Sequence, residues 1–231
     1  MRALLVFSVL LLIKVLGKMF YRFDSSWVGD PVNQPWSDIR LVAFLHHTSL
    51  YEPIFLGAVP NSIIWRLARQ GVVPGADKTL ARPWVGLIFR AVAHRVVSIS
   101  RQRDHTWDEF MSAINAGAMV VMAPEGRMMR PSGLDLNGKP MTVRGGIADI
   151  LEAIETGRML VAYSGGLHHV QAPGERFPRL FRTVRIRFEI LDIERYCSDL
   201  GGTGQGSKAF RASVIKDLEA RRSRHCPISP S

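Results

Sequence analysis

The chain has 231 residues, enough for one sizeable hydrophobic core, and 47% hydrophobic residues exclude a largely disordered protein. A formal net charge of +10 at pH 7 favours a polyanionic partner, either nucleic acid or an anionic membrane. The two cysteines, Cys197 and Cys226, form no Cys-x-x-Cys or Cys/His cluster. We therefore expect no disulfide framework and no metal site, and the reduced cytosol fits best.

The N-terminus carries an apolar run over residues 3–13, broken only by Ser8 and followed by Lys14 and Lys18. The run is shorter than the ~20 apolar residues of a membrane-spanning helix, and no small-x-small cleavage site follows it. We predict a helix that lies in the membrane interface, with its basic side chains at the headgroups. The alternatives are a spanning helix and a helix packed on the protein's own core.

Residues 24–38 are predicted to be a linking loop because glycine, proline and asparagine recur in them. This loop would divide the chain into an N-terminal membrane-associated segment with its linker, residues 1–38, and a globular domain, residues 39–231. Short apolar or alternating runs predict strands at 41–45, 62–65, 95–100, 118–123, 159–163 and 184–191. Helical spacing and end signals predict helices from Pro53 and at 79–91, 104–116, 145–156 and 208–224.

Strands that alternate with helices indicate an α/β fold, with a mixed, largely parallel sheet flanked by helices. Ligands of such folds bind beyond the carboxyl ends of the strands. His47, Arg101 and Glu125 each follow a different predicted strand. We therefore expect the three side chains to share one site.

His47 and Glu52 are the candidate catalytic residues. Imidazole takes up a proton near neutral pH, and a carboxylate on its other nitrogen fixes the tautomer and stabilises the imidazolium. A loop histidine with a solvated carboxylate is the alternative. His46 should point the other way along an extended backbone and is predicted to be structural. The pair His168-His169 is expected in a packed or surface loop, since no carboxylate cluster accompanies it.

A second group of candidates follows the predicted strand 118–123, in the sequence Pro-Glu-Gly-Arg of residues 124–127. Gly126 would allow close backbone approach to a ligand, and the planar guanidinium groups of Arg127 and Arg130 suit phosphate. Residues 61–103 add eight Arg or Lys against one acidic residue, which suggests a pocket for an anionic headgroup. An ordinary strand-end turn and a solvated basic face are the alternatives.

Together these blocks resemble the glycerophospholipid acyltransferase family, and most closely its lysophosphatidate (1-acylglycerol-3-phosphate) acyltransferases. Residues 47–52 resemble the family's catalytic His-x4-Asp motif, and residues 98–101 its second motif, whose arginine binds the acceptor phosphate. Residues 124–127 resemble its Pro-Glu-Gly-Thr-Arg motif, residues 144–146 its Lys-x-Gly, and residues 160–165 its apolar fourth motif. The resemblance covers about residues 40–170.

The resemblance implies an enzyme, an O-acyltransferase. It would move a fatty acyl group from acyl-CoA or an acidic acyl carrier protein, the co-substrate, to a lysophospholipid hydroxyl, giving phosphatidic acid. His47 would act as general base oriented by Glu52, and Arg101, Glu125, Gly126, Arg127 and Arg130 would bind the substrate. No cofactor or nucleic acid is implied. The protein would associate with the anionic cytoplasmic face of a membrane.

The chain departs from the family pattern in three motifs, of which the fourth, residues 160–165, lacks the family's usual proline. Glu52 stands where the family has aspartate, and Arg127 directly follows the motif glycine, where the family has threonine. These departures bear more on which acceptor lipid is used than on the acyl transfer itself. Two alternatives follow: acylation of another lysolipid, such as a lyso-aminolipid or a glycolipid, and a non-catalytic basic module that binds lipid.

Overall fold

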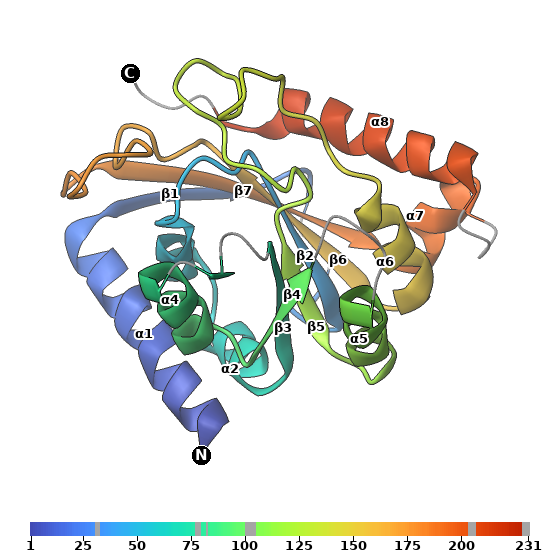
Figure 1. Cartoon of the computed structure of the whole chain (residues 1–231), viewed down its shortest axis with the longest axis horizontal. Coiled ribbons are helices and arrows are strands. Elements are labelled where there is room, and N and C mark those ends of the chain that lie inside the picture. The colour runs from blue at the N-terminus through green and yellow to red at the C-terminus, as the bar shows by residue number, and fades with distance from the viewer. Residues whose placement is uncertain (31–32, 77–79, 82, 100–104, 203–206, 228–231) are drawn as a thin grey trace.

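A seven-stranded sheet forms the centre of the protein (Figure 1). The computed structural model describes residues 1–231 except 31–32, 77–79, 82, 100–104, 203–206 and 228–231. The strand order is β1-β7-β6-β2-β5-β3-β4, and neighbouring strands run parallel except β6 and β7, which are antiparallel. The strands are β1 (Arg22–Trp27), β2 (Ile39–Leu45), β3 (Gly71–Ala76), β4 (Arg95–Ile99), β5 (Met119–Met122), β6 (Arg158–Ser164) and β7 (Thr183–Asp192). The predicted mixed, largely parallel α/β fold is confirmed.

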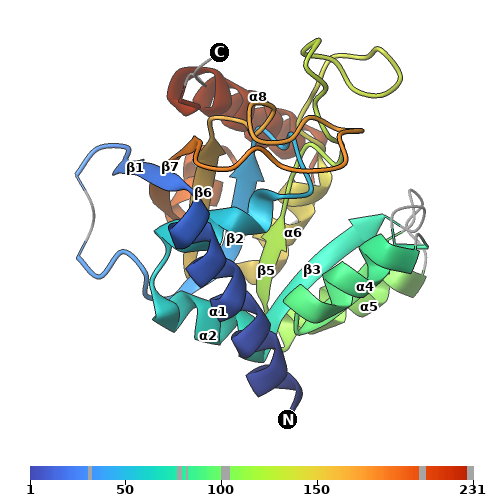
Figure 2. The same ribbon diagram turned by 90° about the vertical axis from the view of Figure 1, so that its left-hand side faces the viewer.

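Helices cover both faces of the sheet (Figure 2). One side carries α1 (Arg2–Phe20), the 3₁₀ helix η1 (Glu52–Ala58), α2 (Asn61–Gln70) and α4 (Pro83–Val92). The other side carries α5 (His105–Asn115), α6 (Gly146–Ile154), α7 (Ile193–Asp199) and α8 (Lys208–His225). The sheet is therefore the middle of three layers, and loops lie at the ends of its strands.

Side-chain alternation on the strands divides the core between these two sides. On β2, Leu41, Ala43 and Leu45 are fully buried against the α5–α8 side, while Val42 and Phe44 pack toward the η1 and α2 side. The interior strand β6 is buried on both faces over six consecutive residues, which is typical of a strand covered by helices on both sides. The predicted apolar strands therefore anchor the sheet.

The N-terminal helix α1 is apolar on two opposite faces. Its Val6 and Leu10 are buried against Ile64 and Ala68 of α2. Large apolar side chains are exposed on the other face: Leu4, Leu5, Leu12, Val15, Leu16 and Met19. Among the described residues, α1 alone is long and apolar enough, by length and composition, to cross a membrane. The helix packs on the domain and also presents an uncovered apolar face.

Two predictions about local structure are wrong. Residues 62–65, predicted as a strand, lie in α2, where Ile63, Ile64 and Ala68 are buried at helical spacing. A four-residue apolar run cannot by itself distinguish a strand from a helix. Residues 24–27, predicted within a linking loop, belong to β1, which pairs with β7 at the edge of the sheet. The segment 1–38 therefore contributes a strand to the sheet of the domain predicted to begin at residue 39.

Gly57 of η1 packs so closely on Phe23 that a larger residue does not fit. A Cβ at position 57 would lie 2.2 Å from the tip of the Phe23 ring. We expect Gly57→Ala to lower the free energy of unfolding by about 1–3 kcal/mol, the usual cost of overpacking. Gly146→Ala is the control, because its Cβ would come no closer than 3.7 Å to Trp107. Urea unfolding of both variants would test this, and equal stabilities would contradict it.

Candidate active site

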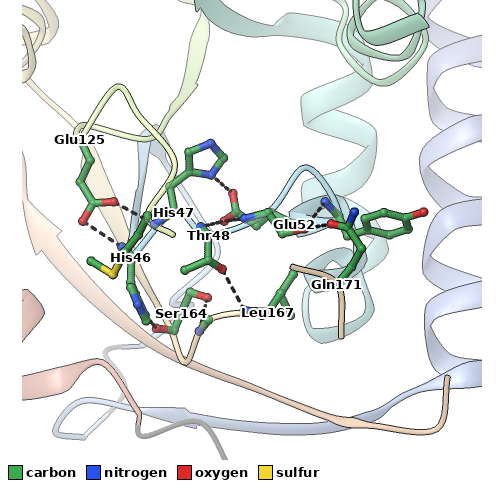
Figure 3. Close-up of polar contacts among 12 residues, drawn as sticks. His46, His47, Thr48, Glu52, Glu125, Ser164, Leu167 and Gln171 are labelled. Carbon is green, nitrogen blue, oxygen red and sulfur yellow. Dashed lines mark hydrogen bonds and ion pairs between the residues drawn. The ribbon is translucent and has the colours of Figure 1, made fainter. Parts of the chain in front are cut away.

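The candidate site lies at one edge of the sheet, where β2, β5 and β6 end. These strands run parallel, so their carboxyl ends meet at that edge. His47 follows β2, Glu125 follows β5 and Gly165 follows β6. Figure 3 shows the side chains and backbone that these three ends bring together. The placement of His47 and Glu125 at adjacent strand ends agrees with the prediction.

His47 and Glu52 form a hydrogen-bonded pair. The Nδ1 atom of His47 bonds Oε2 of Glu52, and the second ring nitrogen points away from the carboxylate (Figure 3). The other oxygen of Glu52 accepts the backbone N–H of Thr48 at 2.8 Å and is 3.4 Å from the N–H of Ser49. The side chains of His47 and Glu52 are 21% and 13% exposed. The carboxylate is thus fixed by the loop it orients, and Nε2 is left for a reacting proton.

The surroundings of His47 shift its proton affinity upward. Burial acts to lower the pKa of His47, but the charge of Glu52, the hydrogen bond to Glu52 and the charge of Glu125 outweigh it. The pKa therefore lies above the ordinary value of 6.5. A base of this kind is a stronger proton acceptor than free imidazole, and it becomes available as the pH rises through the raised pKa.

Glu125 holds the backbone that presents His47. His46 has a φ of +67°, a left-handed conformation that non-glycine residues seldom adopt. The turn directs two consecutive amides at one carboxylate: the N–H of His46 donates to Oε1 of Glu125 at 3.3 Å and the N–H of His47 donates to Oε2 at 2.8 Å. The Glu125 side chain is fully buried. We predicted Glu125 as a substrate-binding residue, and this role stays a prediction; in the structure its carboxylate contacts the backbone amides of His46 and His47.

Arg222 of α8 completes this arrangement and was not foreseen from the sequence. Its guanidinium donates to Oε1 of Glu125 at 2.6 Å and to the carbonyl of Met141 at 3.1 Å. A buried carboxylate is costly unless a charged partner compensates it. The two residues are 97 positions apart, and no local pattern signals their pairing. The C-terminal helix thereby supports the turn at His46 and His47.

The loop after β5 lies directly against the loop of residues 46–52. Gly126 has a φ of +63°, which a residue without a Cβ tolerates. The N–H of Met129 donates to the carbonyl of His47 at 2.8 Å. Arg127 forms an ion pair with the buried carboxylate of Asp135, and Arg130 donates to the carbonyl of Pro173 at 3.1 Å. Both predicted phosphate-binding arginines are therefore near the His47 loop but already contact protein groups.

Several basic residues that the structure describes outside this loop contact groups of the protein itself. Arg101, which we predicted to bind the substrate, lies outside the residues that the structure describes. In the basic stretch 61–103, Arg66 donates to the carbonyl of Ile39 at 2.9 Å and Arg95 pairs with Glu109 at 2.5 Å. On α8, three of the arginines form ion pairs within the domain: Arg211, Arg221 and Arg222. Much of the positive charge therefore has a structural partner.

The remaining histidines near the site bind backbone carbonyls. His46 Nδ1 lies 2.9 Å from the oxygen of Ser164, His168 Nε2 lies 2.9 Å from that of Met129, and His169 Nε2 lies 2.9 Å from that of Thr183. Within the described part of the chain, no group of three His, Cys, Asp or Glu side chains could hold a metal ion. Among the described histidines near the site, His47 is the one paired with a carboxylate.

The imidazole of His47 is therefore paired with the carboxylate of Glu52, beside the loop that carries Arg127 and Arg130. A family model described as Acyltransferase matches residues 32–164. Because this match covers more than half of the chain, the protein belongs to the acyltransferase family, as the motifs predicted.

The overall fold is shared with a solved structure. The 1-acyl-sn-glycerophosphate (LPA) acyltransferase PlsC from Thermotoga maritima aligns over 94% of this chain and 78% of its own, with a TM-score of 0.59 and 20% sequence identity. At that identity the likeness concerns the fold. No curated protein sequence matches the chain.

The raised pKa of His47 can be tested by removing the charge of Glu52. Glu52→Gln removes the negative charge beside His47 and its hydrogen bond to a carboxylate, while the burial of His47 remains. The pKa of His47 should therefore fall from its raised value. Two-dimensional NMR of the imidazole nitrogens, assigned with His47→Gln, would measure it. Glu109→Gln, which removes a carboxylate remote from the site, should leave the titration unchanged. An unaltered pKa in Glu52→Gln would contradict the assignment.

The support that Arg222 gives to Glu125 predicts a large effect on stability. Arg222→Met leaves the buried Glu125 carboxylate uncompensated, which should lower the free energy of unfolding by about 3–5 kcal/mol. Arg224→Met removes an exposed charge from the same helix and should change stability by less than about 0.5 kcal/mol. Adding Glu125→Gln to Arg222→Met should recover part of the loss. Chemical denaturation of the four proteins would test this, and equal losses for Arg222→Met and Arg224→Met would contradict it.

Proposed function

We propose that the protein transfers a fatty acyl group from a thioester donor, acyl-CoA or acyl carrier protein, to the free hydroxyl of 1-acylglycerol-3-phosphate, which gives phosphatidic acid. One observation carries the proposal: the His47 imidazole is bound through Nδ1 to Glu52, and its Nε2 is directed away from that carboxylate (Figure 3). Membership of the acyltransferase family supports acyl transfer as the reaction. The fold that the chain shares with the Thermotoga maritima enzyme is consistent with a lysophosphatidate acceptor.

The proposed mechanism is a direct transfer. Neutral His47 removes the hydroxyl proton through Nε2 as the oxygen attacks the thioester carbonyl. The tetrahedral intermediate then breaks its C–S bond, and the imidazolium returns the proton to the leaving thiolate. Glu52 stabilises the imidazolium between these two steps. The products are an ester and a free thiol, and this direct route has no covalent acyl-enzyme intermediate.

The acceptor phosphate is assigned to the loop beside His47. Arg127 and Arg130 are the cations on either side of Met129, whose N–H donates to the carbonyl of His47 and so joins the two loops. A guanidinium group has five N–H donors, so the contacts with Asp135 and Pro173 leave donors for a phosphate. Arg101, after β4, is proposed as a third phosphate ligand on the strength of the motif alone.

Membrane association at the cytoplasmic face follows from the same proposal. The acceptor and the product are lipids, and α1 has an uncovered apolar face that includes Leu5, Leu12 and Met19. A helix that packs one face on its domain and buries the other in the headgroup and acyl boundary brings the site to its substrate. The positive net charge suits both an anionic leaflet and an acidic carrier protein.

The base assignment predicts a loss of rate when His47 is removed. His47→Ala should lower kcat by about 10²–10⁴-fold, the usual contribution of a general base, with little change in KM. The assay uses purified protein, lysophosphatidate and labelled acyl-CoA or acyl carrier protein. His105→Ala, an exposed histidine on α5, is the control and should retain activity.

Other results of this assay separate the alternatives. Turnover that persists in His47→Ala rules out His47 as the base. Turnover only with a lyso-aminolipid or a glycolipid acceptor replaces the proposed substrate but keeps the chemistry. No turnover with any lysolipid, together with retained vesicle binding, identifies a non-catalytic lipid-binding homologue.

A further inference from the structure

The segment between β6 and β7 exposes large apolar side chains that the proposed reaction does not use. Phe177 is 76% exposed, Leu180 44% and Phe181 68%. Single exposed apolar residues are common on soluble proteins. Here three lie within five consecutive positions, and exposed apolar side chains that gather in this way mark interaction surfaces.

This exposure is built into the fold. The N–H of Phe181 donates to the carbonyl of Phe20 at 2.7 Å, and the N–H of Arg22 donates to the carbonyl of Arg182 at 3.1 Å. Phe181 adopts a φ of +61°, which is unfavourable for an aromatic residue. Backbone strain of this kind persists only where surrounding contacts enforce it. The segment is therefore held in place with its apolar side chains outward.

Basic residues alternate with the apolar ones. Arg176, Arg179 and Arg182 are all exposed, and the one acidic residue of the segment, Glu175, pairs with Arg179. The guanidinium of Arg176 lies 5.9 Å from the centroid of the Phe177 ring. Aromatic side chains at the level of lipid headgroups, flanked by arginines that reach anionic phosphates, are typical of a membrane interface.

The segment continues the apolar face of α1. The rings of Phe20, at the end of α1, and Phe181 contact each other edge to face at 6.0 Å. Figures 1 and 2 both place the orange segment that precedes β7 at the C-terminal end of α1, on the same side of the molecule. Leu16 is exposed one turn before Phe20 and is therefore its neighbour on the surface of α1, and Met19 is exposed beside them. One flat bilayer could therefore contact both elements at once.

The base of this segment reaches the catalytic loop. The N–H of Leu167 donates to Oγ1 of Thr48 at 2.8 Å, and Oγ of Ser49 donates to Gln171 at 3.0 Å (Figure 3). Contact of the segment with a membrane would thus place the lipid surface beside residues 47–52, where a lipid acceptor has to arrive.

We propose that residues 176–182 form a second membrane anchor, which inserts Phe177, Leu180 and Phe181 into the interface of an anionic bilayer. Arg176 and Arg182 contact the anionic headgroups. The anchor extends the membrane association proposed for α1, but it does not depend on the reaction at His47, because it acts by binding alone.

A fluorescent reporter on the segment tests this directly. Phe177→Cys is labelled with an environment-sensitive maleimide in the full chain. Burial raises the pKa of Cys197 to about 11 and that of Cys226 to about 12, so both native thiols react slowly. With phosphatidylcholine vesicles that contain phosphatidylglycerol, we expect a blue shift and protection from an aqueous quencher. Leu136→Cys, at a site of 74% exposure on another loop, is the matched control and should show neither change.

The arginines are tested with the same reporter. Arg176→Gln and Arg182→Gln should each weaken the affinity for the anionic vesicles by about fivefold and have little effect on pure phosphatidylcholine. Arg195→Gln, which removes a charge that is 84% exposed on α7, should have no effect.

Three results would overturn the proposal. The first is no spectral change at position 177 with anionic vesicles. The second is an equal change at position 136, which would indicate non-specific adsorption. The third is a change without vesicles that grows with protein concentration, which would identify a second copy of the chain as the partner. All of these measurements are made without substrate, so a failure of the proposed acyl transfer would not affect them.

Discussion

The candidate site depends on the hydrogen bonds that the buried carboxylate of Glu125 accepts from the backbone before η1. This carboxylate accepts the consecutive amides of His46 and His47 and so stabilises the left-handed turn that ends β2. Consecutive N–H groups that converge on one anion form a strong, directional binding site. Arg222 compensates the charge from α8, on the far side of the loop. The orientation of the proposed base is thus fixed by three elements that are remote in sequence: β2, the loop after β5 and the C-terminal helix.

The second half of the pair is fixed from the opposite side of the sheet. Glu52 begins η1, and η1 packs on α1, where Gly17 lies against Ile54. Lys14 of α1 donates to the carbonyl of Val59 at 2.7 Å, just after η1. The helix with the uncovered apolar face is therefore part of the support for the carboxylate that orients the base. The proposed membrane contact and the geometry of the candidate site are therefore coupled, because both depend on how α1 packs on the domain.

The sequence predicted the features that depend on local pattern. Apolar runs bounded by polar residues gave β2, β5 and β6, and a spacing of five residues was sufficient to pair His47 with Glu52. It failed where the pattern was weak or the partner was distant. The strand β1 is largely polar because it lies at the sheet edge, so it has no apolar signature. The contact of Glu125 with Arg222 joins positions 97 residues apart, and only the packed fold brings them together.

The proposed chemistry and the choice of acceptor rest on different residues. The acceptor phosphate is proposed to bind Arg127 and Arg130, in the loop after β5. Arg127 faces Asp135, whose pKa is lowered by hydrogen bonds from the Lys139 and Asn137 amides and by Arg127 itself, so Asp135 is ionised at neutral pH. A phosphate that binds Arg127 has to share the guanidinium with this carboxylate. Two negative charges on the phosphate oppose Asp135, and the spare N–H donors of the arginine favour binding. The balance of these two effects depends on the loop, whereas the proton transfer proposed for His47 depends on Glu52, which binds its Nδ1, and on Glu125, which holds its backbone. Acceptor choice can therefore change with the loop while the base stays the same.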